Sequence, residues 1–265
     1  MSKKPGDWWD KSWNPIEGCT PISEACDHCW AMGFLRRFRD GQKPGEIRYY
    51  PERFNTPNSP LNRKRPTRYF VGSLTDMFQT KITETATEDG HIYADNWINH
   101  VIEMPLKAPQ HTYCFLTKRA DEMARLRLHW LYLREMHCRI WLGITAENQE
   151  RYDQRWADIN HLVSAVRYVS FEPLLGPVDM NHFMSKPDWV IVGGETGPGA
   201  RRPDIKWIRD LRDQCVAAKI PFWFKSFGAG YREKWSIGEF TCTSMTPESK
   251  RLLDNREWSE LPEGK

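Results

Sequence analysis

The amino-acid sequence predicts an α/β protein built as a partial (βα) barrel. From Arg68 onward, short apolar runs rich in β-branched and aromatic residues recur, and amphipathic segments separate most of them. Nearly every apolar run ends on polar residues or glycine. The length of 265 residues suits one such barrel better than two separate domains.

Six apolar runs are the strand candidates. Because they are apolar along most of their length and alternate with helices, they suit a parallel sheet covered by helices, which leaves a barrel or a doubly wound sheet. We favour the barrel because polar strand ends converge on one ligand-binding face in parallel α/β folds. The runs are Arg68–Ser73, Thr112–Thr117, Ile140–Thr145, Val166–Ser170, Trp189–Gly193 and Pro221–Lys225.

Amphipathic segments between these strands predict helices that cover the sheet. The barrel and its N-terminal loop are expected to span residues 1–228. Residues 229–265 have weak periodicity and are expected to form an irregular C-terminal appendage. The predicted helices are Tyr93–Glu103, Ala120–Arg134, Gln149–Leu162 and Lys206–Ala218.

Composition restricts the class of protein but does not identify its substrate. The net charge of +3 neither requires nor excludes a nucleic-acid partner. No apolar run approaches the roughly 20 residues that span a bilayer, and the polar N-terminus lacks an apolar signal core, so we expect a cytoplasmic protein without a membrane partner. Its cysteines are then thiols or metal ligands. Four isolated ones are expected to be packing residues: Cys114, Cys138, Cys215 and Cys242.

The strongest chemical signal is a Cys-x6-Cys-x2-Cys array formed by Cys19, Cys26 and Cys29. Three thiolates this close need a shared cation. Zinc would require a fourth ligand, and His28 neighbours Cys29 too closely for both to reach one tetrahedral ion. A [4Fe-4S] cluster held by three cysteines leaves one iron open to the amino and carboxylate groups of S-adenosylmethionine. We therefore expect this cluster and this cofactor, with structural zinc as the alternative.

Four blocks, together with the cysteine array, carry a resemblance to a known family. They are Trp13–Cys19, Phe115–Arg119, Glu172–Pro177 and Val192–Ala200. The chain resembles a phage-associated three-cysteine-motif family, a divergent branch of the radical S-adenosylmethionine (radical SAM) superfamily, from about residue 13 to residue 228. The resemblance implies a partial barrel of radical SAM type with Cys19, Cys26 and Cys29 as cluster ligands. The usual superfamily motif is Cys-x3-Cys-x2-Cys with an aromatic residue before the last cysteine. This chain has His28 in that place, which leaves the adenine contact open.

The same resemblance implies where the cofactor is bound. Ser73, Thr75 and Asp76 follow the first predicted strand, where superfamily members present groups to the methionine amino end, although an N-cap is an equal alternative. Asp76 is the principal candidate. The carboxylates that close other strands could bind the ribose hydroxyls or orient the substrate, and the glycine-rich loop could face the cofactor or form only a tight turn. The cofactor candidates are His28, Ser73, Thr75, Asp76, Glu147, Glu172, Gly193, Gly194 and Glu195.

Basic and aromatic residues predict a phosphate-bearing substrate at the same face. Phosphates pair with cations and bases stack on exposed aromatic rings, although most tryptophans are core residues. The cations are Lys118, Arg119, Arg201, Arg202 and Lys225, and the nearby tryptophans are Trp8, Trp9, Trp13 and Trp30.

The predicted activity is radical SAM chemistry on a nucleic-acid base. The resemblance implies a step of phage thymidine hypermodification, such as rearrangement of an amino-acid adduct, with flavodoxin or ferredoxin as electron donor, in the host cytoplasm if the gene is a phage's. A peptide or a free nucleotide is the alternative substrate. The rival from another class is a zinc-stabilised nucleic-acid-binding module without catalysis.

Overall fold

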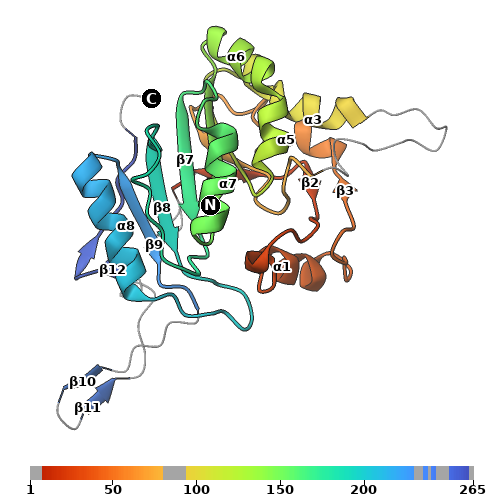
Figure 1. Cartoon of the computed structure of the whole chain (residues 1–265). Helices are drawn as coiled ribbons and strands as arrows, with labels where there is room; N and C mark the ends of the chain where they lie inside the picture. The colour runs from red at the N-terminus through yellow and green to blue at the C-terminus, as the bar shows by residue number, and fades with distance from the viewer. Residues whose placement is uncertain (1–7, 80–93, 230–234, 238–239, 243–250, 263–265) are drawn as a thin grey trace.

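The computed structural model describes residues 8–79, 94–229, 235–237, 240–242 and 251–262. Its centre is a seven-stranded parallel sheet that curls into a half-barrel (Figure 1). The strands lie in the order in which they occur along the chain, as in a barrel, whereas a doubly wound sheet reverses its order partway. The predicted partial α/β barrel is therefore confirmed. The strands are β1 (Lys11–Trp13), β4 (Arg68–Val71), β5 (Thr112–Thr117), β6 (Arg139–Thr145), β7 (Val166–Phe171), β8 (Trp189–Gly193) and β9 (Phe222–Ser226).

All six predicted strands are present, and the sheet also contains the unpredicted β1. This strand has only three residues, Lys11, Ser12 and Trp13, and pairs in parallel with β4. Such a short run, with polar residues at two of three positions, carries no strand signal of its own. Its position matters because the chain leaves β1 and runs directly into the cysteine array.

The helices lie mainly on the outer face of the sheet, except for α1 (Trp30–Phe38), which lies on the side of the β7 and β8 arrowheads (Figure 1). The sequence did not predict α1. The helix expected over Ala120–Arg134 is divided at Leu126, where ψ is 18°. The start of the helix expected at Tyr93 lies outside the described residues. The other helices are α3 (Ala94–Ile102), α4 (Met104–Lys107), α5 (Ala120–Arg125), α6 (Arg127–Glu135), α7 (Gln149–Ile159) and α8 (Ile205–Ala218), with 3-10 turns η1 (Glu24–Cys26) and η2 (Pro51–Phe54).

Alternation along the strands divides the core into two layers. Tyr113 and Phe115 of β5 pack in the outer core under the helices, whereas Cys114 between them faces the inside of the half-barrel. Since both faces are buried, the strands are apolar almost throughout. The inner layer is aromatic and consists of Trp8, Cys114, Trp141, Val166, Tyr168, Trp189, Ile191 and Trp223.

The end of the chain covers the outer edge of β9. The backbone N–H of Phe224 donates to the carbonyl of Trp258 at 2.9 Å, and the N–H of Glu260 donates to the carbonyl of Phe222 at 3.2 Å. Part of the segment expected to be an irregular appendage therefore pairs with the sheet. The small two-stranded pairs are β2 (Ile16–Glu17) with β3 (Arg48–Tyr49), β10 (Trp235–Ile237) with β11 (Phe240–Cys242), and β12 (Leu252–Leu253) with β13 (Arg256–Glu257).

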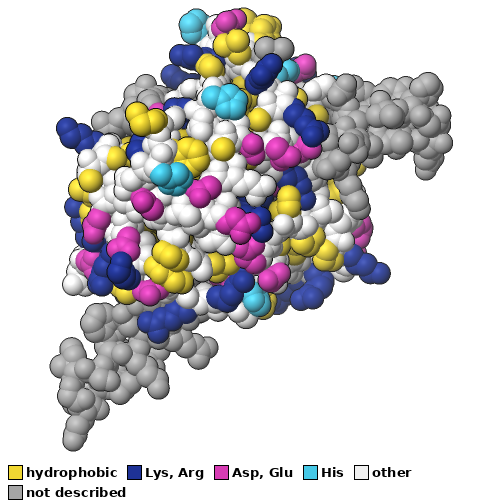
Figure 2. Space-filling view, in the orientation of Figure 1, with side chains coloured by type: hydrophobic (Ala, Val, Ile, Leu, Met, Phe, Trp, Pro, Cys, Tyr) yellow, Lys and Arg dark blue, Asp and Glu magenta, His cyan; other side chains and the backbone are white. Residues whose placement is uncertain are grey.

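Charges of both signs are mixed on the surface. On the face seen in Figure 2, Lys and Arg are interspersed with Asp and Glu and do not gather into one large patch.

The isolated cysteines are structural. Cys114, Cys138 and Cys215 are buried thiols, as expected for packing residues, and Cys242 lies in β11. Within the described part of the chain, no helix is both long and apolar enough to cross a bilayer.

Candidate active site at the strand ends

The three cysteines of the array lie in one cleft at the carboxyl ends of the parallel strands. Cys19, Cys26 and Cys29, from the N-terminal part of the chain, form one wall of it. The opposite wall comes from residues at the ends of successive strands, as the sequence predicted. These residues include Ser73, Thr75 and Asp76 after β4, Lys118 and Arg119 after β5, Thr145 at the end of β6, Glu172 after β7, Gly194 and Glu195 after β8, and Lys225 in β9.

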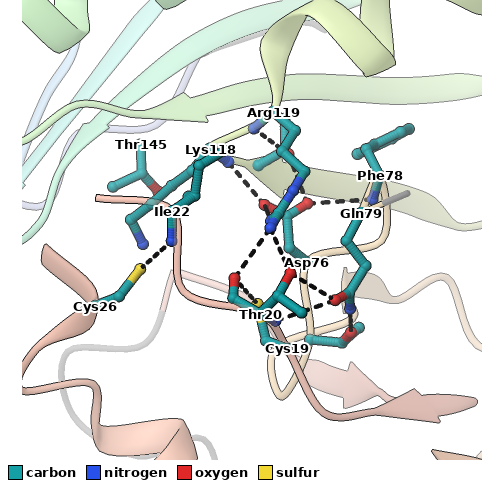
Figure 3. Close-up of polar contacts among 12 residues, drawn as sticks. Cys19, Thr20, Ile22, Cys26, Asp76, Phe78, Gln79, Lys118, Arg119 and Thr145 are labelled. Carbon is teal, nitrogen blue, oxygen red and sulfur yellow. Dashed lines mark hydrogen bonds and ion pairs between the residues drawn. The ribbon is translucent and has the colours of Figure 1, made fainter. Parts of the chain in front are cut away.

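The base of the cysteine loop is fixed to the end of β4. The N–H of Gly18 donates to the carbonyl of Leu74 at 3.0 Å, and the hydroxyl of Thr75 donates to the carbonyl of Gly18 at 2.5 Å. The buried amide of Gln79 completes this contact: its Nε2 donates to the Gly18 carbonyl at 2.9 Å, and its Oε1 accepts from the N–H of Thr20 at 3.1 Å (Figure 3). The residues flanking Cys19 are thereby held on both sides.

Asp76 joins the ends of β4 and β5. Its Oδ1 accepts hydrogen bonds from the N–H of Phe78 at 3.1 Å and the hydroxyl of Thr117 at 2.6 Å. Its Oδ2 accepts from the N–H of Lys118 at 3.0 Å and from Nη1 of Arg119 at 3.1 Å (Figure 3). These four bonds use the full acceptor capacity of a carboxylate. A cofactor ammonium could contact Asp76 only by displacing one of them, so the geometry gives Asp76 a positioning role.

Two arginines predicted to contact substrate phosphate hold the cysteine loop in this structure. Nη2 of Arg119, which is buried, donates to the carbonyl of Thr20 at 3.0 Å. Nη2 of Arg201 donates to the carbonyl of Glu24 at 2.7 Å and to the carboxylate of Glu195 at 2.6 Å. Burial opposes ionisation of Glu195, but the hydrogen bonds and charge of Arg201 outweigh it and lower the pKa of that carboxyl. Both guanidinium groups are therefore committed to protein partners.

Helix α7 provides a further attachment for the loop, whereas Glu147 does not reach the cleft. The amide of Asn148 donates to the carboxylate of Glu24 at 2.5 Å, and its oxygen caps α7 by accepting from the N–H of Arg151. Glu147 is completely buried and forms an ion pair with Arg155 at 2.8 Å. Glu147 therefore lies outside the lining of the cleft, and its carboxylate is paired with Arg155 of α7.

The glycine-rich loop after β8 packs against protein. A side-chain carbon at Gly194 would lie 2.1 Å from the carbonyl oxygen of Phe227, and one at Gly197 would lie 1.8 Å from that of His28. The ring of His28 lies with its Nδ1 at 2.8 Å from the carbonyl of Pro198. Gly197 thus leaves room for the cysteine loop, and Gly194 for the segment that follows β9. Of the two glycines expected to face the cofactor, Gly194 lines the cleft and Gly193 lies within β8.

The remaining predicted cations differ in their surroundings. Lys225 forms an ion pair with Glu172 at 2.5 Å inside the cleft. Lys118 also lines the cleft, and no ion pair joins its ammonium to any described residue. Arg202 is exposed and does not line the cleft. Lys118 is thus the predicted cation best placed for an anionic ligand.

The surroundings of the cysteine thiols affect their ionisation and their hydrogen bonds. Burial raises the pKa of the Cys19 thiol to about 11, with a further rise from Asp76 that the charges of Arg119 and Lys118 oppose. The sulfur of Cys26 accepts from the N–H of Ile22 at 3.5 Å (Figure 3). In the described residues, no three His, Cys, Asp or Glu side chains are arranged so as to hold a metal ion.

Sequence reasoning missed several residues that build this site. Gln79 and Thr20 belong to no chemical motif, and their partners become apparent only when β4 and the cysteine loop are side by side. Among the tryptophans, Trp8 and Trp13 are core residues, whereas Trp9 and Trp30 line the cleft. Phe70 also lines the cleft, and its place in a predicted strand gave no indication of this.

Comparison with known proteins identifies the family. Residues 4–262 match the family model described as Protein of unknown function (DUF5131). No curated protein and no solved structure matches the chain. Since the family match extends over nearly the whole sequence, including the cysteine loop and every strand of the half-barrel, the chain belongs to the DUF5131 family.

Proposed function

We propose that this protein is a radical SAM iron-sulfur enzyme in which Cys19, Cys26 and Cys29 hold a [4Fe-4S] cluster. One observation carries the proposal: three cysteines from a single loop line a cleft at the carboxyl ends of a parallel half-barrel. In parallel α/β proteins that end of the sheet is where ligands bind. The partial barrel of radical SAM type is part of the same proposal.

The chemistry of the three donors suits an iron-sulfur cluster, although their side chains are not gathered around one point in this structure. Thiolates are the ligands that such clusters prefer, and a thiol that binds a metal is deprotonated even where burial disfavours its charge, as at Cys19. The positive charges of Lys118 and Arg119 act on Cys19 and would favour its thiolate. When bound, the cluster and S-adenosylmethionine would supply a 5'-deoxyadenosyl radical for hydrogen abstraction.

The chain's own residues would position the reactants and limit water. The bonds from Gln79, Arg119 and Arg201 hold the cysteine loop over the strand ends, and the aromatic inner layer closes the half-barrel beneath the cleft. Lys118 would bind an anionic group of the cofactor or the substrate. Asp76 would orient Arg119.

The substrate that we propose is a nucleic-acid base, in keeping with the phage-associated family that the sequence resembles. A cleft lined by aromatic rings and by Lys118, whose ammonium has no ion-pair partner in the described part of the chain, supports a base linked to an anionic group. Thymidine hypermodification, with reduction by flavodoxin or ferredoxin, is the specific form of the proposal. A peptide or a free nucleotide would be accepted by the same chemistry.

Anaerobic purification and reconstitution test the proposed function. Brown protein with iron and sulfide, which forms 5'-deoxyadenosine and methionine from S-adenosylmethionine under strong reductant, is the expected result. Colourless protein that contains zinc would identify the rival, a non-catalytic nucleic-acid-binding module. Iron-loaded protein that forms no 5'-deoxyadenosine would overturn the enzymatic part of the proposal.

A further inference from the structure

Two chemically different groups of residues line the cleft. One group consists of the three cysteines and Lys118, whose charge acts on Cys19. The other consists of Trp9 and Phe70, whose ring centroids lie 5.1 Å apart. The proposed cluster accounts for the cysteine group alone.

The aromatic group rests on packed side chains. Trp8, which is 2% exposed, lies under both rings, with centroid distances of 4.9 Å to Trp9 and 5.2 Å to Phe70. The ring of Tyr168 packs against Trp8 in turn, at a centroid distance of 5.8 Å, and Gly143 leaves room for this ring because it has no side chain. The hydroxyl of Tyr168 donates to the carbonyl of Phe115 at 2.9 Å. Trp9 and Phe70 are only half-buried although everything beneath them is packed. Exposed aromatic faces on a fixed support are suited to stacking against a planar ring.

A polar pair lies beside this surface. Lys225 follows the inward-facing Trp223 by two positions in β9, so its side chain enters the same concave space. Its ammonium lies 5.7 Å from the ring centroid of Trp9 and 2.5 Å from the carboxylate of Glu172. One strong donor and one strong acceptor thus adjoin the aromatic face. Every nucleobase presents a donor and an acceptor next to one another on its edge.

We propose that Trp9 and Phe70 form a stacking subsite for the substrate base, whose edge is held by Glu172 and Lys225. This inference deepens the proposed function and rests on it, because it assigns the aromatic residues of the same cleft to the substrate. A base is also present in the adenine of S-adenosylmethionine. The two sources share one chemistry, and the test separates them.

The test compares a fluorescein-labelled oligothymidylate with an abasic oligonucleotide of the same length, which has the same phosphates and no bases. Fluorescence anisotropy with the full-length protein, without reductant, gives both affinities. The wild type is expected to bind the oligothymidylate about tenfold more tightly or better. In Trp9→Leu and Phe70→Leu this preference should fall to about twofold or less, while Trp207→Leu on the outer helix α8 should retain it. Circular dichroism establishes which variants are folded, and Phe70→Leu carries the test if Trp9→Leu is not.

Equilibrium dialysis with S-adenosylmethionine on the same variants separates the two sources. Binding that stays within about twofold of wild type supports the substrate assignment. An equal loss for S-adenosylmethionine would give the subsite to the cofactor adenine and overturn the proposal, as would a wild type with no preference for bases. Because no turnover is needed, a failure here leaves the 5'-deoxyadenosine result untouched, and the two proposals fail separately.

Discussion

The carboxylate of Asp76 and the guanidinium of Arg119 form an ion pair of 3.1 Å between the ends of two neighbouring strands, and each side chain is 9% exposed. Nη2 of Arg119 donates to the carbonyl and the hydroxyl of Thr20, the residue after the first cysteine. The carboxylate of Asp76 therefore helps to position the cysteine loop through Arg119.

Replacement of Asp76 by Asn is expected to lower the free energy of unfolding by about 3–5 kcal/mol, because it leaves a buried guanidinium without its counter-charge. Urea denaturation of the protein without cluster measures this. The matched control is Glu122→Gln, which removes a pair with the exposed Arg125 and should cost less than about 1 kcal/mol. Equal effects in the two variants would contradict the positioning role of Asp76.

Each alanine variant of Cys19, Cys26 and Cys29 is expected to lose its iron and sulfide after anaerobic reconstitution, because a cluster with one protein ligand fewer is not retained. Cys138→Ala should load as the wild type does, since this thiol is buried away from the cleft. Iron and sulfide per chain are the measurements. Full loading of Cys26→Ala would remove it from the ligand set.

The salt dependence of nucleic-acid binding should respond to Lys118 and not to Arg201. In Lys118→Gln the slope of log affinity against log salt for single-stranded DNA is expected to decrease by about 0.7, the value for one lost phosphate contact. Arg201→Gln, whose side chain already contacts Glu195 and Glu24, should leave the slope unchanged. Anisotropy titrations at several salt concentrations measure both, and the opposite pattern would restore Arg201 as the phosphate ligand.

Stability at acid pH should depend on the pair of Glu195 and Arg201. The pKa of Glu195 is lowered from 4.5 in the folded protein, so its stabilisation is complete above pH 4.5 and is lost as the pH falls through the folded pKa. The difference in unfolding free energy between wild type and Glu195→Gln should therefore shrink below pH 4.5. Urea denaturation at a series of pH values measures it, and Arg201→Gln should show the same pH range. A difference that is constant with pH would contradict the pairing.

The barrel was predictable where the chain is buried on two sides. Strands such as Trp189–Gly193 are apolar at nearly every position and carry their own signal. The three residues of β1 carry no such signal, because this segment is a strand only through its pairing with β4. The break in the helix at Leu126 was likewise not predictable, because no proline or glycine marks it in the sequence.

Within the site, the sequence predicted the position of the cleft but not the role of each cation near it. Arg119 and Arg201 follow strands in the same way as Lys118, and only their partners distinguish them. Those partners are distant along the chain: Thr20 is 99 residues from Arg119, and Glu24 is 177 residues from Arg201. A local pattern identifies a cation near the strand ends, whereas its pairing depends on which loops the completed fold brings beside it.

The attachment of the cysteine loop to late strands has a consequence for biosynthesis. The cysteines are translated well before Asn148 and Arg201, the residues that hold their loop. During translation the loop with the three thiols is therefore not yet held by these two residues, and the thiols are exposed to oxidants and to free metal ions. Because contacts of such long sequence separation form only after the intervening chain has folded, insertion of the proposed cluster should follow the translation of Arg201. A truncated chain that ends before Arg201 should consequently accumulate as a form that scavenges metal without building a cluster.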